Sequence, residues 1–167
     1  MNLTDDKIKD WALTVCDQLS SIFQLNIHFK NFKTDELIYS NFIQQNQSKM
    51  IGVVSEFDDT HETILLTTDL SAIIGTTTCF FSKDIQNKTI YNDQLTFVES
   101  CFSKKIIQQF HDAFDQKKIP INHVKSEIDL NLIHPFHIDD LIKMYCFDWE
   151  INEKKYGEMM ICHAHIF

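Results

Sequence analysis

One order of expected elements occurs twice in this chain of 167 residues. Each half has an amphipathic helical segment, an alternating strand, a polar spacer and a hairpin, with an offset of roughly 90 residues between the halves. The halves share no evident sequence identity, so the repeat is one of pattern. Such an order predicts an α/β fold that is internally duplicated, with long amphipathic helices packed on one mixed or antiparallel sheet.

The first half begins with apolar residues at helical spacing over residues 5–23. "LNIHFKNF" then alternates apolar and polar residues as a half-buried strand does. "MIGVVSEF" and "ETILLTTD" flank "DDTH", which predicts a hairpin. "DLSAIIG" predicts a short helix that is capped by Asp69 and ends at Gly75.

The second half contains the most regular helix, "LTFVESCFSKKIIQQFHDAF", at residues 95–114. Thr96 and Glu99 have the form of a capping box, which satisfies backbone amides at a helix start. The strand candidate "IPINHVKSEIDL" follows, and two further strands flank "EKKYG" as a second hairpin. No Pro-, Gly- or Ser-rich linker separates the halves, so we expect one domain, residues 1–167, with pseudo-repeats at about 1–80 and 90–167.

The charge balance argues against several functions. The net charge is −9, and all 15 basic residues are lysines. Proteins that bind nucleic acid concentrate positive charge and rely on arginine, so we expect no such partner. With three glycines there is no phosphate-binding loop or dinucleotide fingerprint. No secretory signal or run of roughly 18 apolar residues is present, so we expect a cytoplasmic protein without membrane insertion.

Three of these segments resemble a known family. "ETILLTTDLSAIIG", "LTFVES" before an apolar helix, and "DLIKMYCFDWEINEKKYGEMMIC" resemble the middle domain of the flagellar switch protein FliM. FliM belongs with the CheC and CheX phosphatases to one superfamily, and type III secretion cytosolic ring proteins are more distant relatives. The resemblance implies a CheC-like fold and a role in protein assembly, at the base of a flagellar or secretion apparatus.

The resemblance also implies a binding site. In FliM the loop after the short helix reads G-G-x-G and contacts the rotor protein FliG, whereas "GTTTC" here keeps only Gly75. We expect Gly75, Thr76, Thr77, Thr78 and Phe80 to form an exposed protein-binding loop that tolerates aspartate at its threonines. A flagellar rotor or secretion-ring protein is the expected partner, while a CheY-type response regulator and a homo-oligomer stay open.

The adjacent rings of Phe80 and Phe81 allow two interpretations. An exposed pair would be a contact patch of the kind found at interaction surfaces. More often one ring of such a pair lies in the core and the other at its edge, and we favour that arrangement.

Catalysis is the main alternative to assembly. The phosphatase branch of the family uses E-x-x-N on its long helices, where the acid anchors the partner and the asparagine orients a water. Here Glu99 is followed at the third position by Phe102, and Asp10 by Leu13. We therefore predict no catalytic residues and a non-enzymatic interaction domain. A CheX- or CheC-like phosphatase of phosphorylated CheY-type regulators remains the alternative.

Histidines and cysteines suggest a metal site only weakly. His163 and His165 would share one face of a strand, and His134 and His137 are close in sequence. No spacing among them matches a zinc pattern, and the five cysteines contain no C-x-x-C pair. We expect reduced structural thiols, no bound metal and no cofactor.

Overall fold

The computed structural model describes residues 3–46, 50–57, 62–82, 95–117, 121–127 and 132–164. These residues form four helices and six strands. The helices are α1 (Asp5–Phe23), α2 (Tyr39–Gln45), α3 (Leu70–Phe81) and α4 (Phe97–Gln116). The strands are β1 (Ile27–Ile38), β2 (Met50–Phe57), β3 (Thr63–Asp69), β4 (Ile121–Glu127), β5 (Leu141–Ile151) and β6 (Lys154–Ala164).

The six strands form one sheet in the order β1-β5-β6-β3-β2-β4, and all neighbours pair antiparallel. Exchanging β1 with β4, β2 with β5 and β3 with β6 gives the same order in reverse. The strand order therefore has the two-fold pseudo-symmetry of an internal duplication, which confirms the predicted fold class. The sheet is antiparallel. The assignment of residues 1–167 to one domain stays a prediction.

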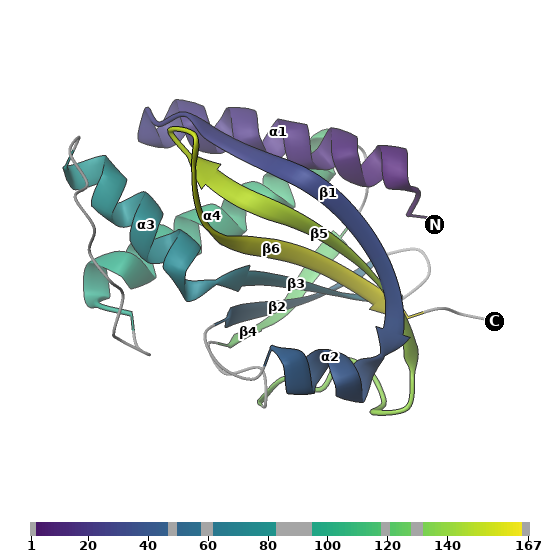
Figure 1. The fold of residues 1–167 in the computed structure, drawn as a ribbon. Helices are drawn as coiled ribbons and strands as arrows, with labels where there is room; N and C mark the ends of the chain where they lie inside the picture. Colours follow the sequence, from purple (N-terminus) through teal and green to yellow (C-terminus); the bar gives the residue numbers. More distant parts are fainter. Residues whose placement is uncertain are drawn as a thin grey trace.

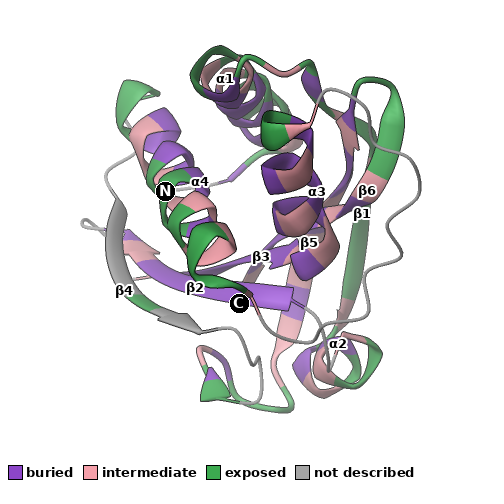
Figure 2. Ribbon diagram, turned by 90° about the vertical axis from the view of Figure 1, so that its left-hand side faces the viewer, coloured by how far each residue is buried: buried purple, intermediate pink, exposed green. Residues whose placement is uncertain are grey.

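Helices cover the two faces of the sheet unequally. Helices α1, α3 and α4 lie on one face, and the short α2 lies on the other (Figures 1 and 2). The buried sides of the three longer helices point toward the sheet (Figure 2). The main core lies between them and the sheet, and a smaller core lies beneath α2 and the segment 132–140. Both faces of the central strands are consequently apolar over part of their length.

The two long helices form where helical spacing predicts them. The Thr4 side chain accepts a hydrogen bond from the Lys7 amide at the start of α1. The capping box of α4 is confirmed, because the Thr96 amide donates to Glu99 Oε2 at 2.7 Å and the Glu99 amide donates to Thr96 Oγ1 at 3.3 Å. Glu99 thus has a structural role at the helix start.

Both hairpins are confirmed at the level of strand pairing. The turn "DDTH" of the first lies outside the described residues, although β2 and β3 pair throughout. In the second, the turn residues are Asn152 and Glu153, with φ of 50° and 67°, and the rest of the expected turn "EKKYG" belongs to β6. Positive φ at both central residues matches the twist of a tight hairpin.

Two features were not predicted from the sequence. Strand β1 continues to Ile38, beyond the predicted "LNIHFKNF", through an irregularity at Asn31, whose φ is 53°. Helix α2 then follows at once and buries Tyr39 and Phe42 in the smaller core. With seven residues, α2 is too short for a helical period to stand out in the sequence.

The predicted end of the helix at Gly75 is wrong. Helix α3 continues from Leu70 to Phe81, so Gly75 lies at its middle. A Cβ on Gly75 would lie 2.8 Å from Cγ of Tyr156 and nearer still to Cδ1, so the glycine permits β6 to approach α3 closely. Asp69 does precede the helix, but its side chain makes no capping hydrogen bond.

Candidate functional site

The predicted binding loop is part of α3. Thr76 is fully buried and Thr77 nearly so, and their hydroxyls donate to the carbonyls of Ala72 at 2.8 Å and Ile73 at 2.9 Å. Thr78 makes the same bond one residue later. These bonds to the preceding turn satisfy threonine hydroxyls inside a helix. The expectation that residues 75–78 form an exposed loop is therefore wrong, and the burial of Thr76 and Thr77 argues against the expected tolerance of aspartate there.

Phenylalanine rings from three helices meet at one end of the helical layer. We call this the aromatic end cluster; it consists of Phe23, Phe80, Phe81 and Phe102. The Phe102 ring lies 5.0 Å from that of Phe23 and 5.3 Å from that of Phe80, between ring centroids. Such separations are typical of favourable aromatic pairs. The cluster joins the ends of α1 and α3 to the first turns of α4.

Part of this cluster faces outward. Phe80 is 44% exposed and Phe81 is 68% exposed. The favoured arrangement, with one ring in the core, is therefore wrong, and both rings lie at the surface. Phe97, 84% exposed, and Val98 are on the first turn of α4, and Ile22 is at the end of α1. The exposed rings of Phe80 and Phe81, whose centroids lie 5.1 Å apart, form an apolar patch of the kind found at interaction surfaces.

The positions of the phosphatase motif carry other side chains. Glu99 is bound to the start of α4, and Phe102 belongs to the aromatic end cluster. Asp10 forms an ion pair with Lys117 at 2.7 Å, and Leu13 is exposed. Helices α1 and α4, which are described over their full length, contain no asparagine. The asparagine of that motif is therefore absent from both helices, whose side-chain amides belong to glutamines such as Gln18 and Gln109.

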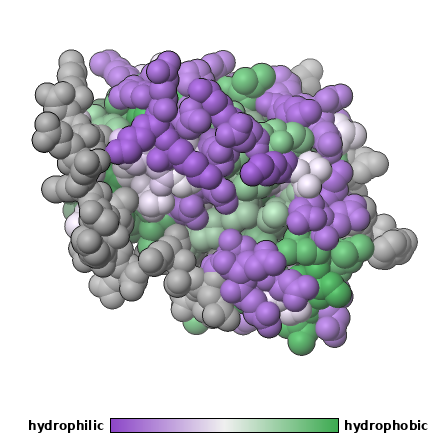
Figure 3. Space-filling view, in the orientation of Figure 1, coloured by the Kyte–Doolittle hydropathy of each residue, from purple (hydrophilic) through white to green (hydrophobic). Residues whose placement is uncertain are grey.

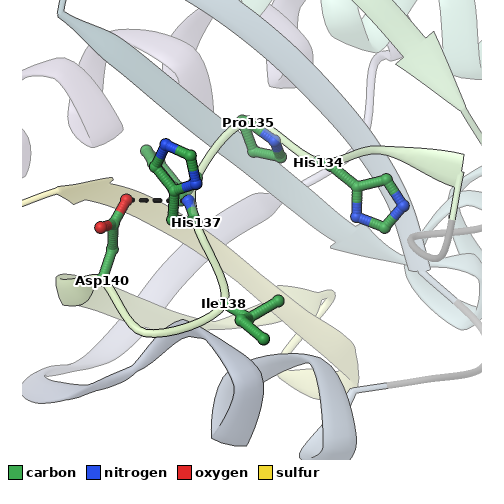
Figure 4. Close-up of a pocket in the computed structure, with 6 residues that line it drawn as sticks. His134, Pro135, His137, Ile138 and Asp140 are labelled. Carbon is green, nitrogen blue, oxygen red and sulfur yellow. Dashed lines mark hydrogen bonds between the residues drawn. The ribbon is translucent and has the colours of Figure 1, made fainter.

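The histidines near α2 line a hollow of about 450 Å³. Figure 4 shows the imidazole rings of His134 and His137 apart on one loop, with Pro135 between them. The backbone N–H of His137 donates to Asp140 Oδ2 at 2.8 Å. His163 instead contacts the Tyr145 hydroxyl at 3.4 Å, and His165 lies outside the described residues.

No group of three or more His, Cys, Asp or Glu side chains is placed to hold a metal in the part of the chain that the structure describes. That the fold forms without a metal stays a prediction. Within the same residues, no helix is both long and apolar enough to span a membrane.

Asp69 is the carboxylate most affected by its surroundings. Its Oδ2 accepts the backbone N–H of Glu158 at 2.8 Å, and Gly157 leaves room for it because any Cβ there would lie 2.7 Å from that of Asp69. Burial raises the pKa of Asp69 to about 6, against the opposing effect of the Glu158 amide. The Asp69 carboxyl group is thus held at the junction of β3 and α3, where burial disfavours its ionised form.

We expect Asp69→Asn to remove a pH dependence of stability. An acid whose pKa is 3.8 when unfolded and about 6 when folded binds its proton more tightly in the folded protein. Its contribution to stability is present at low pH and is lost as the pH rises through that interval. Relative to the unmodified protein, Asp69→Asn should gain about 2 kcal/mol between pH 4 and pH 6, measured by urea unfolding. Asp139→Asn, at an exposed position, is the surface control. A difference in unfolding free energy between Asp69→Asn and the unmodified protein that does not change with pH would contradict the expectation.

Comparison with known proteins places this geometry in context. No protein-family model matches the chain, and no curated protein matches it. Among solved structures, the FliM middle domain of Vibrio alginolyticus superposes with a TM-score of 0.74 at 11% identity, over 94% of this chain and 90% of that one. The chain has the fold of the FliM middle domain.

Two other solved structures extend this finding. A chain of the FliG–FliM complex from H. pylori matches with a TM-score of 0.72 at 13% identity, over 97% of this chain and 94% of that one. The chemotaxis protein CheX of Desulfovibrio desulfuricans matches at 0.51 with 12% identity, over 94% and 97% of the two chains. The resemblance to FliM stated from the sequence is therefore confirmed for the fold, and the CheX likeness is weaker.

Within this FliM-like fold, sequence reasoning identified the neighbourhood of the surface but not its members. It named Phe80, which does lie in the aromatic end cluster. It also named Gly75, Thr76, Thr77 and Thr78, which lie within α3 and are mostly buried. It missed Phe97 and Val98, although "LTFVES" contains both of them. A signal was present for Phe97, an apolar residue in the first turn of a helix, beside the stripe that contains Val98, Phe102 and Ile106.

Proposed function

We propose that this protein is a non-enzymatic interaction domain of the FliM middle-domain type. It assembles in a flagellar switch or a related secretion platform, in the cytoplasm at the base of that apparatus. The FliM-like fold supports this proposal, and the exposed aromatic surface at the end of the helical layer is the observation that carries it. Motor-switch and secretion-ring assembly need such a surface, whereas catalysis on α1 and α4 would need an asparagine that these helices lack.

The proposed partner is a flagellar rotor protein of the FliG type or a secretion-ring protein. FliM occurs in complexes with FliG and with SpeE in H. pylori, so this fold is compatible with protein partners of different kinds. We place the contact on Phe80 and Phe81, at the end of α3. Gly75, Thr76, Thr77 and Thr78 support it from within the helix. A CheY-type regulator and a second copy of the chain are further candidate partners.

Substitution of the exposed rings should weaken this contact. We expect Phe81→Ser and Phe97→Ser each to reduce affinity for the FliG-type protein encoded in the same genome by roughly 30-fold, the effect of an interface hot spot of about 2 kcal/mol. The melting temperature should change little, because both rings are more than half exposed. Calorimetric titration with the two purified proteins measures the affinity.

Leu13→Ser is the matched control, since Leu13 is 64% exposed on α1 but lies three turns of helix away from Phe23. It should leave the affinity unchanged. Equal losses for Leu13 and Phe81 variants, or unchanged binding by the Phe81 and Phe97 variants, would remove the aromatic surface from the interface. A saturable acceleration of phospho-CheY decay by the unmodified protein would instead assign it to the phosphatase alternative.

A further inference from the structure

Strands β5 and β6 bring together side chains that contain sulfur. Their register places Met144 opposite Cys162 and Cys146 opposite Met160. One residue pair separates these two rows, and it points into the main core beneath α1, α3 and α4. The four sulfur-bearing side chains therefore share the other face of the sheet. We call them the sulfur quartet.

The quartet is closed on one side and open on the other. Met160 and Cys162 are buried in the smaller core, whereas Met144 and Cys146 are half-buried at its margin. Figure 3 shows a weakly hydrophobic area on the front of the molecule, over β5 and β6, between the hydrophilic upper part and the hydrophobic lower right. Met144 and Cys146 are therefore the members of the quartet that are partly exposed to solvent.

A second observation points to the same place. Thr67 on β3 lies directly opposite Met160 and continues its row across the sheet. This residue is fully buried, and its hydroxyl has no hydrogen-bond partner among the described residues. Buried hydroxyls are ordinarily paired, so a polar group without a partner beside the quartet requires an explanation. Packing alone explains a methionine or a cysteine, but it leaves this hydroxyl unpaired.

The spacing suits one small ion. Side chains directly opposite on antiparallel strands have Cβ atoms about 4.5–5.5 Å apart, and the diagonal neighbours remain within reach of long side chains. Methionine is flexible enough to turn its sulfur toward a common centre. Two adjacent rows therefore offer two thiols and two thioethers around a single point.

We propose that Met144, Cys146, Met160 and Cys162 bind one monovalent copper ion, Cu(I). Thiolate and thioether sulfur are soft ligands, and of the common biological metals Cu(I) accepts both. Structural zinc sites use thiolate and imidazole, and here two of the four ligands are neutral thioethers. On binding, each thiol loses its proton as the copper–sulfur bond forms, so no oxidant is required.

Burial of the two thiols determines whether they are protonated before copper binds. Burial raises the pKa of Cys146 to about 12, and the nearby carboxylate of Glu158 raises it further. Burial also raises the pKa of Cys162, with Cys146 as a second cause. Both groups are thus protonated in the metal-free protein at neutral pH, and copper must displace protons.

The experiment is a competition between the reduced protein and a coloured Cu(I) chelator under nitrogen. The unmodified protein should retain one copper ion per chain. Cys146→Ala and Met160→Leu should each lower the affinity at least about tenfold. Met159→Leu is the matched control, because the neighbouring Met159 is equally buried but points into the main core, so its variant should bind as the unmodified protein does.

The exposed Cys101 provides the control for adventitious binding by a surface thiol. Cys101→Ala should bind copper normally. The proposal fails if the unmodified protein retains no copper, if Cys101→Ala removes the bound ion, or if Met159→Leu and Met160→Leu lose affinity equally. Melting curves of the metal-free variants show whether a variant that binds copper more weakly is still folded. Half-buried Cys146 makes its variant the safer test than one at buried Cys162.

Discussion

Replacement of Trp11 by alanine is expected to lower the free energy of unfolding by about 3–5 kcal/mol, the cost of removing a large aromatic side chain from a core. Trp11 is fully buried between α1 and α4. Its indole N–H donates to the carbonyl of Phe110 at 3.0 Å, and its ring stacks on Phe114 with centroids 4.8 Å apart. One substitution therefore removes packing, stacking and a buried hydrogen bond between the two long helices. Urea unfolding measures the loss.

Two variants make this expectation specific. Trp11→Phe keeps most of the aromatic volume and loses the indole N–H, so it should cost about 1–2 kcal/mol, the value of one buried hydrogen bond and a small cavity. Leu13→Ala, on the exposed side of the same helix, should change stability by less than about 0.5 kcal/mol. A Trp11→Ala protein no less stable than Leu13→Ala would mean that α1 and α4 do not pack as described.

Thr76→Asp is expected to cost at least about 3 kcal/mol, because it places an unpaired charge at a fully buried position. The Thr76 hydroxyl donates to the Ala72 carbonyl, which is a hydrogen-bond acceptor and repels a carboxylate. A thermal melt or urea titration would show the loss. This outcome is the reverse of what an exposed loop at this position predicts.

Two further variants show how much of the loss comes from the buried charge and how much from the missing methyl group. Thr76→Ser keeps the hydroxyl and should cost about 1 kcal/mol for the missing methyl group. Thr78→Asp, at a half-buried position of the same helix, should be tolerated better than Thr76→Asp. If Thr76→Asp melts at the temperature of the unmodified protein, the segment is solvent-exposed and the helix does not extend to Phe81.

Local signals in the sequence were sufficient for much of the fold. Helices α1 and α4 are long, and each carries an apolar stripe and a side-chain cap at its start, so several independent signals agree. The hairpins were equally accessible, since alternating strands flank short polar stretches. The duplication followed from the order of these elements, and the strand order of the sheet is its direct expression.

The end of α3 was not accessible in this way. A glycine after an apolar run ordinarily indicates a helix end, and three threonines are poor helix formers. The reason for Gly75 is Tyr156, a residue of β6 in the other half of the chain, whose ring occupies the space of a Cβ. No local rule detects a contact so distant in sequence. The error then moved the candidate surface from the rings of Phe80 and Phe81 to side chains that are buried.

The strand order also has a consequence for how the chain folds. In each half the first strand is set apart from the hairpin that follows it: β5 and β6 separate β1 from β3, and β3 and β2 separate β4 from β6. Among the described strands, β1 pairs with β5 alone, so Ile27 finds its partner Ile151 near the opposite end of the sequence. Bringing together strands so far apart in the sequence costs conformational entropy before their contacts form, and this cost slows folding. On the ribosome, β1 must therefore wait for β5, near the other end of this sequence, to be synthesised before the two strands can pair.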